Sequence, residues 1–81
     1  MKPALTRIDH IGIVVADFDA HVAQLEALGL ELRREGLDSD SHVRHYRSGD
    51  ATIELIDVLD ESARTERLDE GEQARIEHIA F

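Results

Sequence analysis

The chain has 81 residues, with 18 acidic against 9 basic side chains and a formal net charge of −9 at pH 7. This charge disfavours nucleic acid as a partner, because binding it depends on neutralising phosphates with Lys and Arg. Cysteine is absent, which excludes disulfides, thiolate nucleophiles and Cys-ligated zinc. No apolar run approaches the roughly 20 residues of a membrane-spanning helix, and the N-terminus lacks the apolar core of a signal peptide. We therefore expect one small, soluble, cytoplasmic domain with no membrane partner.

The predicted elements follow the order β-α-β-β-β, then a charged connector, then a final strand. Asp17 is a suitable N-cap for the helix, and Gly29 follows it at the position of a left-handed C-terminal cap. The connector holds six acidic and two basic residues; it has some helical character, but we interpret it mainly as solvated chain. The predicted ranges are a strand at 7–15, a helix at 18–28, strands at 30–35, 42–47 and 51–58, the connector at 60–73 and a strand at 75–81.

The first strand has two different faces. Alternation places Ile11, Ile13 and Val15 on a purely aliphatic face that suits helix packing, and it places His10 and Gly12 on the other. The pattern of residues 7–13 recurs at 75–81, so that His78 repeats the context of His10. This internal repeat predicts that a second structural unit begins at about residue 75.

His10, Glu54 and His78 are the candidates for metal chemistry. Each lies within an apolar strand, on the face that alternation assigns away from the helix. Glu54 stands out because burying a carboxylate without a partner is costly. Two imidazoles and a carboxylate suit a divalent metal such as Co²⁺, Ni²⁺, Zn²⁺, Mn²⁺ or Fe²⁺. Taken singly, each residue is equally compatible with a structural role, and Glu54 could face solvent on an open antiparallel sheet.

His45 is a second candidate for the site. If Gly49 and Asp50 form a two-residue hairpin loop, His45 lies opposite Glu54, where it would orient the carboxylate or carry a proton. A three-residue loop would place Arg44 there instead. The only basic cluster in the sequence comprises Arg33, Arg34, Arg44 and Arg47. These arginines could hold a phosphate or carboxylate group, or they could form surface salt bridges.

Four stretches together resemble the vicinal oxygen chelate superfamily, which includes glyoxalase I, methylmalonyl-CoA epimerases, extradiol dioxygenases and antibiotic-resistance proteins. They span nearly the whole chain, and the closing pattern is most similar to that of the epimerases. The stretches are residues 9–15 followed by Asp17, then 28–30, 49–56 and 76–81.

This resemblance implies an α+β fold made of a single βαβββ module (residues 1–81) with an extra C-terminal strand that opens a second module. It also implies that His10, Glu54 and His78 are metal ligands. The implied activity is that of a divalent-metal-dependent isomerase or lyase acting next to a carbonyl, most like methylmalonyl-CoA epimerase, with Glu54 and His45 as the catalytic candidates. The alternatives are a glyoxalase I-type lyase, an extradiol dioxygenase, or a non-catalytic small-molecule-binding module.

The chain departs from the family pattern at the fourth ligand, a glutamate late in the second module, which has no counterpart before Phe81. Two arrangements could complete a site. In a homodimer, His10 and Glu54 of both chains would supply four ligands. Within one chain, His10, Glu54 and His78 would leave positions for water or substrate. A third possibility is that the chain is part of a longer protein. The expected substrate is a small carbonyl compound or an acyl-CoA, although the net negative charge disfavours the CoA diphosphate.

Overall fold

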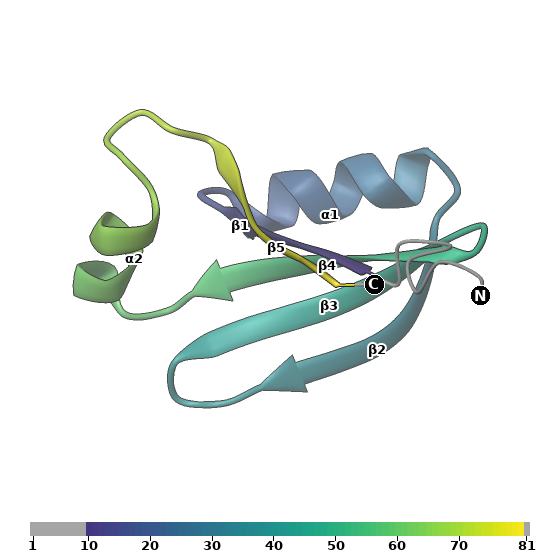
Figure 1. Cartoon of the computed structure of the whole chain (residues 1–81), viewed down its shortest axis with the longest axis horizontal. Helices are drawn as coiled ribbons and strands as arrows, with labels where there is room; N and C mark the ends of the chain where they lie inside the picture. The colour runs from purple at the N-terminus through teal and green to yellow at the C-terminus, as the bar shows by residue number, and fades with distance from the viewer. Residues whose placement is uncertain (1–9, 81) are drawn as a thin grey trace, which may run out of the picture.

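The structure, a computed structural model, describes residues 10–80, and it forms one five-stranded mixed sheet with two helices (Figure 1). The strand order in the sheet is β2-β3-β4-β1-β5. This arrangement confirms the predicted α+β class and the βαβββ order with an additional final strand. Residues 7–9 and Phe81, at the ends of the first and last predicted strands, lie outside the described residues. The elements are β1 (His10–Val15), α1 (Phe18–Ala27), β2 (Glu31–Leu37), β3 (Ser41–Ser48), β4 (Ala51–Val58), α2 (Glu61–Arg67) and β5 (Ala74–Ala80).

Helix α1 begins and ends where the sequence predicted, to within one residue. The Asp17 side chain accepts a hydrogen bond from the Ala20 N–H at 3.1 Å, which satisfies one of the free donors of the first turn. Gly29 follows the helix with a φ of 88°, a left-handed conformation that glycine adopts without steric cost. These two residues therefore set the length of α1 locally.

Helix α1 packs on one face of the sheet and forms the larger core with it (Figure 1). This confirms the prediction that the face of β1 bearing Ile13 and Val15 packs against the helix. The other face of β1 is thereby left for His10 and Gly12. The buried residues of this core are Val15, Phe18, Tyr46 and Leu55.

The interpretation of residues 60–73 as mainly solvated chain is wrong, because the helical character noted there is realised as α2 and Leu68 is buried. Asp60 caps the helix by accepting a hydrogen bond from the Ala63 N–H at 2.9 Å. Leu68 is only 6% exposed and packs with Val14 and Ile56 on the face opposite α1. The six acidic residues dominated the sequence pattern. The helix, however, depends on its cap and on the packing of Ala63 and Leu68 against β1 and β4. No helix of the described chain is long and apolar enough to cross a membrane.

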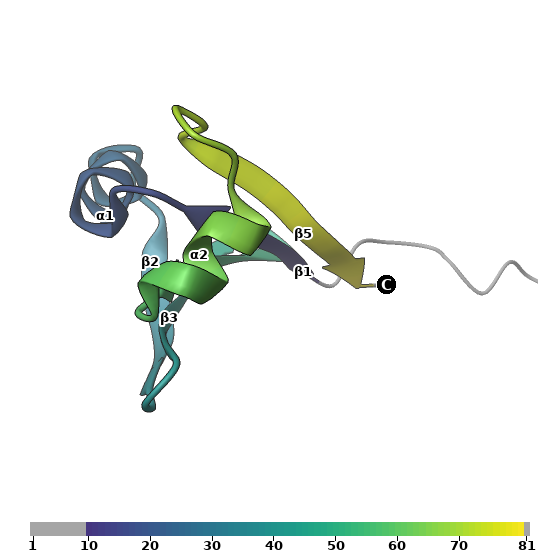
Figure 2. The same ribbon diagram turned by 90° about the vertical axis from the view of Figure 1, so that its left-hand side faces the viewer.

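Strand β1 lies between β4 and β5, and it pairs in parallel with β4 and antiparallel with β5. Gly12 is therefore opposite Glu54 on one side and His78 on the other. In Figure 2 the sheet is strongly twisted, with β2 and β3 steeply inclined to β1 and β5. The register shifts once in β5, at Glu77, and once in β2, at Arg33. Each shift leaves one extra residue in its strand, which is a β-bulge.

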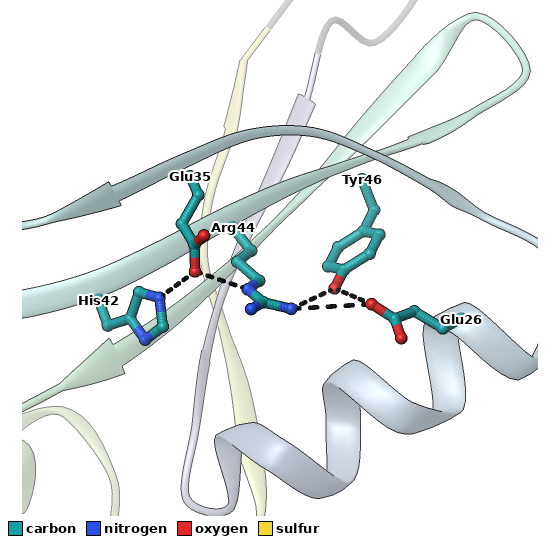
Figure 3. Close-up of polar contacts among 5 residues, drawn as sticks. All are labelled: Glu26, Glu35, His42, Arg44 and Tyr46. Carbon is teal, nitrogen blue, oxygen red and sulfur yellow. Dashed lines mark hydrogen bonds and ion pairs between the residues drawn. The ribbon is translucent and has the colours of Figure 1, made fainter.

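A polar network joins α1 to β2 and β3 on the face of the sheet that α1 covers (Figure 3). Arg44 donates from Nε to Glu35 at 2.8 Å and from Nη1 to the Tyr46 hydroxyl at 3.2 Å. That hydroxyl in turn donates to Glu26 of α1 at 3.0 Å, and His42 lies 2.5 Å from Glu35. Alternation along β3 directs these side chains towards α1 and His45 away from it. The network therefore stabilises the packing of α1 and is separate from the candidate site.

We expect the ionised side chain of Glu35 to stabilise the fold at neutral pH and to lose this contribution in acid. Its pKa is lowered, first by the hydrogen bond with His42 and then by that with Arg44. A carboxyl with a lower pKa in the folded state stabilises the fold when ionised, and that stability is lost as the pH falls below about 4.5. Glu35→Gln should therefore lower the free energy of unfolding at pH 7 and flatten its decline in acid. Urea denaturation from pH 7 to pH 3 measures this.

The matched control is Glu66→Gln, which changes an exposed glutamate of α2. Asp38 and Glu72 also have lowered pKa values, so a residual acid decline is expected in the Glu35 variant. Equal pH profiles for the two variants would show that the network does not couple protonation to folding.

Candidate metal centre

His10, Glu54 and His78 meet on the face of the sheet opposite α1. They come from three adjacent strands, β1, β4 and β5, and each offers a ligand atom within 4.8 Å of the others. The Nε2 atoms of His10 and His78 are 3.0 Å apart, and His78 Nε2 is 3.0 Å from Glu54 Oε1. The sheet thus brings together three residues that are far apart in the sequence.

Gly12 makes room for this cluster. It is the residue of β1 that lies between Glu54 and His78 in the two ladders, and the His78 ring lies over it. A Cβ atom at this position would lie 2.2 Å from His78 Cε1, far inside van der Waals contact. A glycine in the middle of a strand usually weakens it, so its presence here is explained by the close approach of the imidazole.

Glu54 is held from two sides. Its side chain is only 17% exposed, and its second oxygen lies 3.2 Å from His45 Nε2. Ser48 pairs with Ala51 across a two-residue turn, and this register places His45 opposite Glu54. The prediction based on the two-residue loop is confirmed, and the alternative with Arg44 is wrong. The other ring nitrogen of His45, Nδ1, is buried and has no hydrogen-bond partner in the described chain.

The donor set and its spacing are compatible with a divalent metal ion. Neighbouring ligands at metal bonds of about 2.1 Å lie about 3 Å apart. His78 Nε2 lies at this spacing from both other donors, and all three donor atoms lie within 4.8 Å of one another. Two imidazole nitrogens at 3.0 Å also cannot present their lone pairs to each other unless a proton or a cation lies between them. The cluster could therefore hold a metal ion through two nitrogens and one oxygen.

A cavity of about 260 Å³ lies beside the cluster. His10 and His45 contribute to its wall, so the candidate metal site borders space that a small molecule could occupy. The sequence singled out every residue of the cluster, but it did not indicate that Arg33 and Arg34 both line the same cavity. The remaining lining residue is Thr52.

The chain has the fold of one half of a vicinal oxygen chelate protein, and the cluster lies on one face of that fold. Over 98% of the chain, the structure matches that of methylmalonyl-CoA epimerase from Mycobacterium tuberculosis, with a TM-score of 0.74 and 26% sequence identity. It also matches a hypothetical protein from Bacillus halodurans C-125 over 90% of the chain, with a TM-score of 0.68 and 26% identity. The chain covers 57% and 55% of these two proteins, just over half of each. No family model and no curated protein matches the sequence.

Proposed function

We propose that the chain binds a divalent metal ion through His10, Glu54 and His78 and catalyses isomerisation at the carbon next to a carbonyl group. The convergence of these three side chains beside a cavity carries the proposal. The similarity to a solved methylmalonyl-CoA epimerase supports an epimerase-like reaction. Three protein ligands leave coordination positions for a substrate oxygen, as in other catalytic metal sites.

A bound metal ion would supply electrophilic stabilisation of negative charge at the carbonyl oxygen. The chain itself would position that ion and the substrate. His45 holds Glu54 Oε2, which leaves Oε1 directed towards His78 and the cluster. A hydrogen bond from a neighbouring residue to a metal-binding carboxylate orients that carboxylate and strengthens metal binding.

His45 is also the proposed proton carrier. Its Nδ1 is buried and has no hydrogen-bond partner within residues 10–80, and its side chain contributes to the wall of the cavity. Histidine is the side chain that most often serves as a general acid–base group in enzymes. Glu54 would contribute to catalysis by holding the metal and by aligning this imidazole.

We further propose that the chain acts as a homodimer. It spans just over half of each matched structure, and β5 exposes Ile76 and Ile79, which are 58% and 46% accessible. A small chain with such an apolar strip gains stability from a second copy that covers it. Because β5 already occupies the edge of β1, the four-ligand arrangement would require β5 to move. The single-chain cluster of three ligands is therefore the arrangement that we propose.

Native mass spectrometry tests the metal site and the oligomeric state together. We expect a dimer with one divalent metal ion per chain, and we expect His10→Ala to lose the metal. The matched control is His21→Ala. His21 lies on α1, where its ring Nδ1 contacts the carbonyl oxygen of Asp17. Metal-free protein after loading with zinc, cobalt, nickel, manganese and ferrous iron would contradict the proposed site.

The reaction itself is tested by proton exchange in D₂O. The metal-loaded chain should incorporate deuterium next to the carbonyl of methylmalonyl-CoA, and the His45→Gln variant should lose most of this exchange while keeping its metal. Methylglyoxal with glutathione, and catechol with ferrous iron, test the lyase and dioxygenase alternatives. A metal-loaded chain that binds these compounds but transforms none of them would be a binding module, which contradicts the proposed activity.

A further inference from the structure

We propose that Arg33 and Arg34 form an oxyanion-binding subsite beside the metal cluster. It would hold a carboxylate or phosphate group of the same small molecule whose carbonyl group faces the cluster. The inference rests on the proposed function for the identity of that molecule, but not for the binding of the anion. Three features support it: the β-bulge at Arg33, the weak or missing ion pairs of the two arginines within residues 10–80, and the cavity that both residues line.

The bulge in β2 turns two consecutive arginines towards one cavity. Leu32 pairs with Tyr46, but the next pair is Arg34 with His45, which leaves Arg33 as the extra residue. In a regular strand, neighbouring side chains point to opposite faces, so one of the two arginines would face α1. Here Arg34 shares the face of His45, and both arginines line the cavity. Bulges commonly redirect side chains next to functional sites.

Arg34 has no ion pair and no hydrogen-bond partner within residues 10–80, which sets it apart from the other arginines of that range. This is unusual in a chain with twice as many acidic as basic residues. Arg33 contacts Glu31 at 3.4 Å, but both side chains are more than half exposed, at 55% and 73%. Such an exposed pair contributes little and exchanges easily for another anion. The other described arginines, each with a carboxylate partner, are Arg44, Arg47, Arg64, Arg67 and Arg75.

The size and the lining of the cavity restrict the ligand. A volume of about 260 Å³ lies below the roughly 300–1,000 Å³ of drug-sized ligand pockets. The cavity therefore has room for a compact acid or for the short acyl part of a thioester, and the body of a coenzyme would lie outside it. Arg33, Arg34 and Thr52 line the cavity. Arginine binds carboxylate and phosphate groups in bidentate fashion. The substrate class that follows is a short carbonyl compound, free or as the acyl part of a thioester, that bears a carboxylate or a phosphate.

The test is a titration of the full chain without added metal, followed by ¹H–¹⁵N NMR at constant ionic strength. The probes are malonate, inorganic phosphate and neutral malonamide. Malonate or phosphate should shift the amide signals of Arg34, His45 and Thr52, and malonamide should not. The tighter of the two anions identifies the group that the subsite accepts. Binding of malonamide as tightly as of malonate would overturn the proposal.

Arg34→Gln should weaken anion binding about tenfold or more, because a charge-assisted pair is lost. Arg33→Gln should weaken it less, since Glu31 already engages that side chain. The control is Arg47→Gln at the β3–β4 turn, where Arg47 contacts the Gly49 carbonyl and Asp50. Equal binding by the Arg34 and Arg47 variants would refute the subsite. Because no metal is present, the outcome is independent of whether the cluster binds one.

Discussion

Gly12→Ala should abolish metal binding while the fold persists. The new methyl group would occupy the space of the His78 ring, because its Cβ would lie 2.2 Å from Cε1 of that ring. His78 is 40% exposed and can rotate outwards, so the clash should displace the ligand and not the strand. Removing a residue that only hydrogen-bonds to a metal ligand typically lowers metal affinity roughly 10–100-fold. Loss of the ligand His78 itself should lower it by more. Titration of zinc or cobalt by calorimetry measures this.

Gly36→Ala is the matched control for this prediction. Gly36 also lies within a strand, but no atom outside its immediate neighbours lies within 4 Å of the position of a Cβ. That variant should bind metal normally and should be equally or slightly more stable, by up to about 1 kcal/mol, because alanine restricts the unfolded chain. If the Gly12 variant bound metal as tightly as the Gly36 variant, His78 would not be a ligand.

Leu55→Ala should cost about 2–5 kcal/mol of stability, the usual range for a buried leucine that leaves a cavity. Leu55 is 2% exposed and packs between β1, β3 and α1, next in sequence to Glu54. A domain of this size has a free energy of unfolding of only about 4–12 kcal/mol. The variant should therefore lose a large fraction of its stability and unfold at a clearly lower urea concentration. Urea denaturation followed by circular dichroism measures the loss.

Leu37→Ala provides the comparison for this second prediction, because Leu37 lies on β2 and is 72% exposed. Its substitution should change the free energy of unfolding by no more than about 0.5 kcal/mol. Equal denaturation midpoints for the two variants would show that the contact of β4 with α1 does not form the main core. A bound metal should raise the midpoint of the Leu55 variant, because binding to the folded state adds stability.

The sequence by itself determined the features that depend on near neighbours. Alternation along 10–15 and 51–58 predicted which face meets the helix, because successive side chains of a strand point to opposite sides. Asp17 and Gly29 predicted the ends of α1 through local hydrogen bonding and backbone geometry. The short turn at Gly49 and Asp50 predicted the pairing of His45 with Glu54. In each case the physical cause lies within a few residues of the chain.

The tertiary structure alone decided the features that require distant segments to meet. The pairing of β5 with β1 brings His78 to His10 across a sequence separation of 68, and the sequence left open whether a second chain would supply the remaining ligands. The sequence showed only some helical character at 60–73, and it did not indicate that Leu68 packs against Val14 and Ile56 and so fixes α2 on the sheet. The bulge at Arg33 left no local signal, since an extra residue is defined only by the strand opposite. Long-range pairing therefore decides which side chains share the cavity, because the register between strands is set by packing across the whole sheet.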